Sequence, residues 1–329
     1  MDRYLTIKNL RVDFQSYSGL HNVVQIDELA IERGQSYALV GESGSGKSVM
    51  AFALQQLLTV PPARISADEL TLDGIPILEK SQREMTGIRG RKIAMIFQDP
   101  MSTLNPVFTV GEQIIQAVRC NHQMGKREAY RRAIELVETV KLPDAERILK
   151  KYPHELSGGQ RQRIIIAIAL GCGADFLIAD EPTRNLDVTI QAGILKLLAT
   201  LQQEQKLTVL FITNNLSLVP LLCERVGLLY RGQIMESGTV ADVIDGHCHP
   251  YTEALIQPLP VTEQEKEAVK AAAAEEAPVE QGCLFQNKCP FCKPVCRQTS
   301  PQMASMSGTH KVRCHRYQEG VREQWANPS

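Results

Sequence analysis

A glycine-rich loop early in the chain has the residue types and spacing of a phosphate-binding site. Residues 41–48 read Gly-Glu-Ser-Gly-Ser-Gly-Lys-Ser and fit the pattern G-x-x-x-x-G-K-[ST], between a strand-like run and a helix-like run. Glycines let the backbone curl so that its N–H groups point at phosphate oxygens, and the following helix adds its positive end. We therefore predict that Lys47 reaches the β- and γ-phosphates of a nucleotide and that Ser48 binds Mg²⁺. The residues predicted to form this site are Gly41, Ser43, Gly44, Ser45, Gly46, Lys47, Ser48 and Val49.

An acidic pair supplies a second part of such a site. The apolar run Phe176–Ala179 predicts a strand inside a sheet, and Asp180 and Glu181 follow at its carboxyl end, where parallel sheets bind ligands. Asp180 can hold Mg²⁺, and Glu181 can orient a water molecule for attack on the γ-phosphate. The alternatives are a glycine-rich turn before an ordinary helix and an exposed acidic turn before Pro182. The occurrence of both motifs in one chain argues against each alternative.

A third motif stands directly before a helical run at residues 156–160, Leu-Ser-Gly-Gly-Gln. The serine predicts a helix N-cap and the glycines expose backbone N–H groups, so this helix start is a second anion site. A chain that already has a complete phosphate loop needs a second anion site only to serve a neighbouring molecule. The motif resembles the signature of ABC-transporter ATPases, in which each subunit's signature closes over the ATP held by its partner. The residues that carry this resemblance are Ser157, Gly158, Gly159 and Gln160.

The resemblance to ABC-transporter ATPases extends over residues 1 to about 257 and implies roles for further residues. It implies that Gln98 belongs to the Q-loop, as a catalytic residue and a Mg²⁺ ligand, and that Asp187 belongs to the D-loop. It also implies that Phe14, or else Tyr17, stacks on adenine. The alternative for Phe14 is a core position. The catalytic residues implied by the whole comparison are Lys47, Gln98, Glu181 and Asn214, and the Mg²⁺ ligands are Ser48, Gln98 and Asp180.

Asn214 departs from the family pattern. Where the family has a histidine that contacts the γ-phosphate, this chain has Asn214 after a strand-like run. Asparagine is shorter than histidine, stays neutral and cannot match the proton chemistry of imidazole, although it can donate one hydrogen bond. We expect the chain's own site to bind ATP and turn it over slowly. The alternative is that Asn214 substitutes adequately for histidine.

Finer motifs narrow the resemblance to the D-type ATPase subunits of oligopeptide/dipeptide/nickel importers. These motifs lie at residues 97–106, 152–155, 249–252 and 282–283, with a later Cys289-Pro290. The resemblance implies ATP-driven dimerisation with a second ATPase subunit, two transmembrane permease subunits and an extracytoplasmic solute-binding protein. It also implies a peripheral place at the cytoplasmic face of the cell membrane. The implied solute is a peptide, with nickel, a metallophore or another peptide-like solute as the alternative.

The cysteines near the end of the chain have metal-ligand spacing. Nine cysteines are many for a reducing compartment, and residues 289–296 contain the pattern Cys-x₂-Cys-x₃-Cys. Thiolates suit zinc or iron–sulfur clusters. The resemblance implies a [4Fe-4S] cluster on Cys283, Cys289, Cys296 and Cys314. Cys292 is then an extra thiol. Zinc, with His310 or His315 as a possible ligand, and a segment without metal are the alternatives.

The elements that must position these residues follow an alternating pattern. Strand-like and helical runs alternate and predict a mostly parallel sheet with helices on both faces. The predicted strands are 37–40, 92–97, 176–179 and 209–213, and the long helices are 126–140 and 190–205. Residues 5–14 and 23–32 alternate with period two and predict a small antiparallel element. Together with the resemblance, this gives an α/β fold: a RecA-like P-loop nucleotide-binding domain with an antiparallel β subdomain and a helical signature subdomain.

Composition divides the chain further. We predict an ATPase domain at 1–257 with its helical subdomain at about 101–165, a polar linker at 258–281, and a short Cys-rich C-terminal extension at 282–329. A charged content of 22% and a net charge of -1 favour a soluble protein and give no argument for a nucleic-acid partner. We expect no signal peptide or membrane span, and therefore membrane contact only through the permeases.

Two further functions are alternatives to the importer. A soluble ABC ATPase acting on nucleic acid or ribosomes usually carries two signatures or a long inserted arm. This chain shows one signature and no long insert between Gln98 and Ser157. An inactive regulatory subunit draws support only from Asn214, and the presence of Glu181 argues against it.

Overall fold

An eight-stranded, mostly parallel sheet forms the centre of the computed structural model, which describes residues 2–256, 279 and 281–320. Its strand order is β12-β13-β11-β10-β3-β9-β8-β7. The four predicted strands are confirmed as β3 (Ser36–Val40), β7 (Ile93–Ile96), β8 (Phe176–Asp180) and β9 (Thr208–Thr213). They pair in parallel, and every residue in them is buried, which explains their continuous apolar runs. Their carboxyl ends therefore meet at one edge of the sheet.

The period-two pattern near the start of the chain forms the predicted antiparallel element. Strands β1 (Arg3–Ser16) and β2 (Gly19–Glu32) pair over nearly their whole length. Three short strands, β4 (Ala63–Ser66), β5 (Glu69–Leu72) and β6 (Ile75–Pro76), complete a five-stranded sheet. Its inner side chains share one hydrophobic core with α1 (Lys47–Leu54) and one side of the main sheet. This shared core fixes β2 beside the loop that precedes α1.

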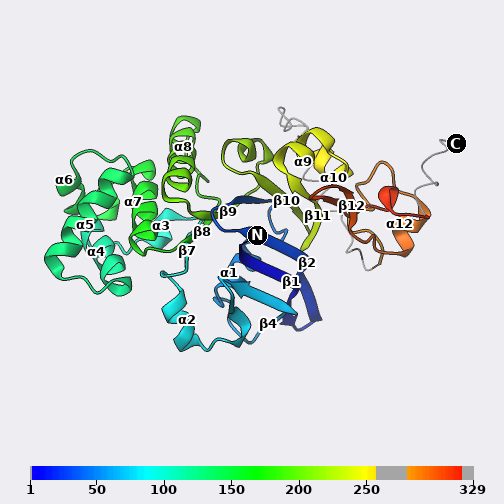
Figure 1. Ribbon diagram of the computed structural model, residues 1–329, viewed down its shortest axis with the longest axis horizontal. Helices are drawn as coiled ribbons and strands as arrows, with labels where there is room; N and C mark the ends of the chain where they lie inside the picture. Colours follow the sequence, from blue (N-terminus) through cyan, green and yellow to red (C-terminus); the bar gives the residue numbers. More distant parts are fainter. Residues whose placement is uncertain (1, 257–278, 280, 321–329) are drawn as a thin grey trace.

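A helical lobe lies at one end of the molecule, away from the cysteine-rich extension (Figure 1). It contains α3 (Pro100–Thr103), α4 (Val110–Asn121), α5 (Lys126–Thr139), α6 (Ala145–Leu149), η2 (Pro153–Glu155) and α7 (Gly158–Gly171). The predicted helices at 126–140 and 190–205 are confirmed as α5 and α8 (Val188–Gln205). The apolar faces of α4, α5 and α7 pack together in one core.

The cysteine-rich extension continues the main sheet. Strand β10 (Arg225–Tyr230) pairs with β11 (Gln233–Thr239), β11 with β13 (His310–Val312), and β13 with β12 (Ala304–Ser307). The remaining elements are η1 (Ile77–Glu79), α2 (Gln82–Ile88), η3 (Leu216–Leu221), α9 (Val240–Gly246), α10 (Pro250–Ile256), α12 (Pro294–Gln298) and η4 (His315–Tyr317). Most of the predicted linker at 258–281 lies outside the described residues. No helix of the described residues combines the length and apolar character needed to cross a bilayer.

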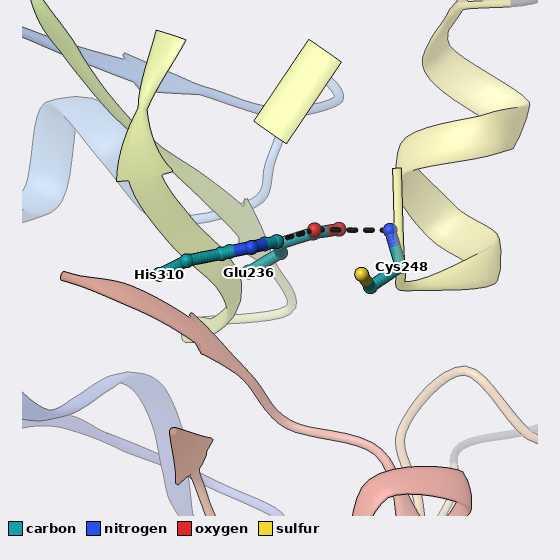
Figure 2. A group of neighbouring side chains, drawn as sticks. All are labelled: Glu236, Cys248 and His310. Carbon is teal, nitrogen blue, oxygen red and sulfur yellow. Dashed lines mark hydrogen bonds and ion pairs between the residues drawn. The ribbon is translucent and has the colours of Figure 1, made fainter. Parts of the chain in front are cut away.

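A buried carboxylate fastens the extension to the sheet. Figure 2 shows Glu236, Cys248 and His310, whose possible metal-binding atoms lie within 4.8 Å of one another. The His310 ring nitrogen is 2.7 Å from one Glu236 oxygen, which also accepts the Cys248 N–H at 3.0 Å. The other oxygen accepts the His249 N–H at 2.9 Å and the Thr252 hydroxyl. Because each oxygen has two hydrogen-bonding partners, this group is satisfied as a clasp without a metal. Cys248 borders this polar group.

Candidate nucleotide-binding site

The phosphate loop follows β3 and curls tightly into α1. At Gly41 a Cβ atom would lie 2.1 Å from the Leu229 carbonyl oxygen, so only glycine fits there. Gly46 has φ +103°, in the left-handed region, and a Cβ atom there would lie 2.8 Å from the Val23 carbonyl oxygen. The sequence pattern therefore matches two steric requirements of this loop. The loop places its backbone N–H groups at the positive end of α1, where anions bind.

Lys47 lies inside the loop and is 5% exposed. Its ammonium donates to the carbonyls of Gly41 and Glu42, each at 2.8 Å, and to the Ser45 hydroxyl at 3.3 Å. Burial lowers the pKa of Lys47, while the nearby carboxylates of Asp180 and Glu181 oppose that shift. These present acceptors are uncharged, so phosphate oxygens would be stronger partners for the same ammonium.

Asp180 and Ser48 provide the oxygen ligands that Mg²⁺ prefers. Asp180 ends β8 and is 3% exposed, and its Oδ1 is buried without a hydrogen-bond partner among the described residues. Burial raises the pKa of the Asp180 carboxyl, and the Ser48 hydroxyl beside it opposes that shift. A buried carboxylate oxygen without a partner is costly, and a divalent cation would satisfy it. These residues therefore fit Mg²⁺.

Glu181 is held by two donors at the edge of the sheet. Gln98, just beyond β7, donates from Nε2 to Glu181 Oε2 at 2.8 Å, and Arg184 donates to the same oxygen at 3.2 Å. Glu181 has φ +43°, a conformation that is uncommon outside glycine. The adjacent strands β7 and β8 bring Gln98 and Glu181 together. Arg184 was not predicted; its only signal in the sequence is its place three residues after Glu181.

One pocket of about 320 Å³ collects most of these groups. It is lined by Val23, Ser43, Gly44, Gly46, Lys47, Ser48, Val49, Gln98, Glu181 and Arg184. Val23, from β2, is a second residue that sequence reasoning missed. The antiparallel sheet thus contributes a wall to the pocket, which explains why it must be fixed beside the loop.

The signature residues do not line this pocket. Ser157 is exposed and caps α7, with its hydroxyl accepting the Gln160 N–H at 3.3 Å and its own N–H donating to the Gln160 side chain at 3.0 Å. Asp187 caps α8 by accepting the Ile190 N–H at 2.9 Å. Gly159 lies against α8, because a Cβ atom there would meet Ile190 at 2.6 Å. The predicted N-cap is confirmed, whereas a role toward another chain stays a prediction.

Phe14, Tyr17 and Asn214 also lie outside the pocket lining. Phe14 is half-buried and packs against the core under the antiparallel sheet, while Tyr17 is fully exposed in the β1–β2 turn. Asn214 is exposed just beyond β9, next to the strand that carries Asp180. Adenine stacking by Phe14 or Tyr17 and a γ-phosphate contact by Asn214 therefore stay predictions.

The four cysteines expected to bind a cluster line one small cavity in the extension. The cavity is lined by Cys283, Cys289, Cys296 and Cys314 with His249, Phe285 and neighbouring residues, and Cys292 is not part of that lining. Burial raises the pKa of the Cys283 thiol to about 12 and that of Cys314 to about 11. A cation beside these thiols would oppose that shift, because it favours the thiolate form.

The spacing of these sulfurs bears on which metal they suit. No three of the four, all within the described residues, lie within 4.8 Å of one another. A tetrahedral zinc with Zn–S bonds of about 2.3 Å needs sulfurs only about 3.8 Å apart. In each set of three, at least one sulfur–sulfur separation is therefore longer than a single zinc ion requires.

Comparisons with known proteins place the sequence among transport ATPases. Residues 24–184 match the family described as ABC transporter, and residues 235–296 match the oligopeptide/dipeptide transporter C-terminal region. A probable peptide ABC transporter ATP-binding protein of Sinorhizobium fredii is 39% identical over 97% of both chains. The oligopeptide transport ATP-binding protein OppD of Bacillus subtilis is 38% identical, covering 94% of this chain and 88% of its own length. The dipeptide transport protein DppD of Haemophilus influenzae is 40% identical over 94% of each.

Solved structures show the same fold. The ATP-binding cassette MJ0796, in a dimeric post-hydrolysis state bound to ADP and phosphate, superposes with a TM-score of 0.64 at 28% identity. It covers 72% of this chain and 98% of its own. CbiO1 from Clostridium perfringens, part of the ABC transporter complex CbiONQ, gives a TM-score of 0.64 at 26% identity, covering 75% of this chain and 92% of its own.

Proposed function

Because this chain belongs to the ATP-binding subunits of the oligopeptide/dipeptide ABC transporter family, we propose that its pocket binds ATP·Mg²⁺ and that hydrolysis there powers peptide import. One observation carries the proposal. Lys47 at the start of α1, Gln98 just beyond β7 and Glu181 just beyond β8 line one pocket. Lys47 provides an ammonium that can bind phosphate, and Glu181 provides a carboxylate that the Gln98 amide holds in position. Phosphoryl transfer to water requires groups of these two kinds.

Each group has one task in hydrolysis. Lys47 exchanges its carbonyl contacts for β- and γ-phosphate oxygens, and the loop N–H groups offset further charge. Ser48 and Asp180 would hold Mg²⁺, which when bound neutralises charge between these phosphates. Glu181 orients a water molecule in line with the γ-phosphate, and Gln98 holds that carboxylate in place.

We infer that the active unit is a pair of ATPase chains. The signature residues 157–160 lie at the start of α7 and outside this chain's own pocket, so they can close over a nucleotide held by a partner. The dimeric state of the similar cassette MJ0796 supports this arrangement. We propose a heterodimer. Asn214 replaces the family histidine in this chain's own site, so a partner ATPase that keeps the histidine would have to provide the faster site.

The chain's own site is proposed to be the slower of the two. Asn214 follows β9 and is exposed, at the edge where Glu181 follows β8. An amide there can donate a hydrogen bond to a γ-phosphate but cannot take part in proton chemistry. ATP would then stay bound at this site through several turnovers at the other.

A groove between β7 and the helical lobe is the proposed docking place for a permease. Its volume is about 570 Å³, and its lining includes Phe97, Phe108, Gln113, Ile165 and Ile168. Phe97 is 36% and Phe108 48% exposed, which fits a cytoplasmic helix of the permease laid against apolar side chains. Phe97 directly precedes Gln98, and Gln98 donates a hydrogen bond to the Glu181 carboxylate. A movement of the docked helix against Phe97 would therefore be passed to Glu181 through Gln98.

Membership of the family supports a proposal for the partners and the location. We propose two transmembrane permeases, an extracytoplasmic solute-binding protein and a peripheral position at the cytoplasmic face of the cell membrane. The names of these relatives favour peptides as the solute over nickel or a metallophore. The family assignment gives no support to a soluble ATPase acting on nucleic acid or ribosomes.

We also propose that the extension holds a [4Fe-4S] cluster. Support comes from the cavity that gathers the four expected cysteines, and from at least one sulfur–sulfur separation in each set of three that is longer than zinc requires. These four cysteines would hold the cluster through their thiolates. Its proposed role is structural, because the extension has little core of its own.

The proposed function is tested by reconstitution. Vesicles containing the permeases, the partner ATPase, the solute-binding protein and this chain should take up labelled peptide when ATP is supplied. Uptake should be lost without this chain. Uptake of nickel complexes in place of peptides would overturn the solute assignment, and uptake that persists without this chain would overturn its role.

A further inference from the structure

Tyr251, in α10, contacts the phosphate loop directly. Its side chain is fully buried, and its hydroxyl accepts the backbone N–H of Glu42 at 3.1 Å and donates to the Leu229 carbonyl at 3.3 Å. The carbonyls of Gly41 and Glu42 are the ones that hold Lys47. One hydroxyl therefore connects the first peptide groups of the loop to β10.

Aromatic rings keep this hydroxyl in place. The Tyr251 ring centroid lies 4.9 Å from that of Tyr230 and 5.6 Å from that of Phe285. Phe285 is 3% exposed and also contacts the rings of Tyr230 and His249 at 5.3 and 5.7 Å. Such contacts fix ring orientation more strictly than aliphatic packing does. Phe285 belongs to the cysteine-rich extension, so the extension supplies one wall of the Tyr251 position.

The extension reaches the loop at a second point. The Lys288 ammonium lies 3.6 Å from the Glu42 carboxylate, at the same loop residue whose N–H the Tyr251 hydroxyl accepts. Phe285 meanwhile lines the cavity that gathers the four cysteines. A continuous set of contacts thus joins the cysteine cavity, Phe285, Tyr251 and the phosphate loop.

We propose that Tyr251 is a positioning residue for nucleotide binding and that the cysteine-rich extension, through Phe285, holds it in its working position. The loop binds phosphate only while its N–H groups converge, and a loop already fixed in that shape binds with less loss of freedom. Removing the hydroxyl leaves the Glu42 N–H without its partner and loosens this shape. The inference rests on the proposed ATP site.

The test is nucleotide affinity of the full chain carrying Tyr251→Phe, which keeps the ring and removes the hydroxyl. The Kd for ATP and for ADP should rise about five- to tenfold, because the loop binds the β-phosphate of both. A purely structural hydroxyl would lower the unfolding temperature and leave both Kd values unchanged, and that result would overturn the proposal. Failure of the parent chain to bind ATP would instead refute the proposed function.

Two control substitutions distinguish an effect on the phosphate loop from the general effect of losing a tyrosine hydroxyl. Tyr4→Phe removes a buried hydroxyl that donates to the Lys92 carbonyl at 3.1 Å, and Tyr317→Phe removes one in the extension that donates to the Cys248 carbonyl at 3.1 Å. Both should leave the Kd for ATP unchanged. Phe285→Leu, which keeps an apolar side chain but removes the ring contacts, should raise it. An unchanged Kd in Phe285→Leu would contradict the part assigned to the extension.

Discussion

Glu181 is positioned by unusual backbone and by two donors. Its φ is positive, and Gln98 and Arg184 both donate to one of its carboxylate oxygens. Lys47 and Asp180, by contrast, are fixed by burial inside the loop and the strand end. The orientation of the Glu181 carboxylate is therefore more sensitive to single side-chain changes than the positions of Lys47 and Asp180.

Arg184→Ala should slow ATP hydrolysis with little change in KM for ATP. Arg184 holds Glu181 without belonging to the loop, and its side chain is 49% exposed, so we expect a modest loss of about three- to tenfold in kcat. Steady-state hydrolysis by the assembled transporter measures it. Arg132→Ala removes a similar exposed pair, Arg132–Glu135 at 2.8 Å on the helical lobe, and should have no effect. Equal kinetics for Arg184→Ala and the parent chain would contradict this role.

The strand ends of the main sheet position the site residues, and a hairpin at the other end of the sheet attaches the cysteine-rich extension. Parallel pairing of β7, β8 and β9 gathers Gln98, Glu181 and Asn214 at one edge. The hairpin β12–β13 extends the same sheet from the opposite side, and Glu236 clasps it through His310. The extension is thereby fixed to the nucleotide domain by backbone pairing as well as by side chains.

The extension should contain iron. Anaerobically purified protein should be brown and hold iron and acid-labile sulfide near four per chain, as a [4Fe-4S] cluster requires. Cys289→Ser should lose the colour because its sulfur lines the cavity. Cys292→Ser is the matched control three residues away and should largely keep it. Zinc without sulfide in such preparations would refute the cluster.

At the scale of the whole molecule, local patterns and distant contacts were not equally predictable. The phosphate loop, the strand ends and the Ser157 cap could be predicted, because each depends on residues adjacent in sequence. The hydroxyl contact of Tyr251 with Glu42 and the pairing of β13 with β11 could not, because neither leaves a periodic signal. Arg184 is only three residues from the predicted Glu181, yet its hydrogen bond to that carboxylate depends on the turn after β8, which the sequence did not predict.

The two ATP sites of the assembled pair should be unequal. Glu181→Gln should reduce turnover of the assembled transporter modestly, whereas the matching substitution in the partner should nearly abolish it. Asn214→His should raise hydrolysis at the slow site, because losing the histidine contact costs on the order of 10²-fold in rate. Equal losses from both glutamate substitutions, with no gain from Asn214→His, would show that the sites are equivalent.

The pocket at the phosphate loop is proposed to bind ATP. Equilibrium binding of ATP·Mg²⁺ to the full chain, compared with Lys47→Ala, tests this proposal. Among the described residues Lys47 is the one ammonium in the pocket lining, and removing it should abolish measurable binding. Lys126→Ala, an exposed lysine at the start of α5, should bind as the parent does. Unchanged ATP affinity in Lys47→Ala would contradict the placement of the site.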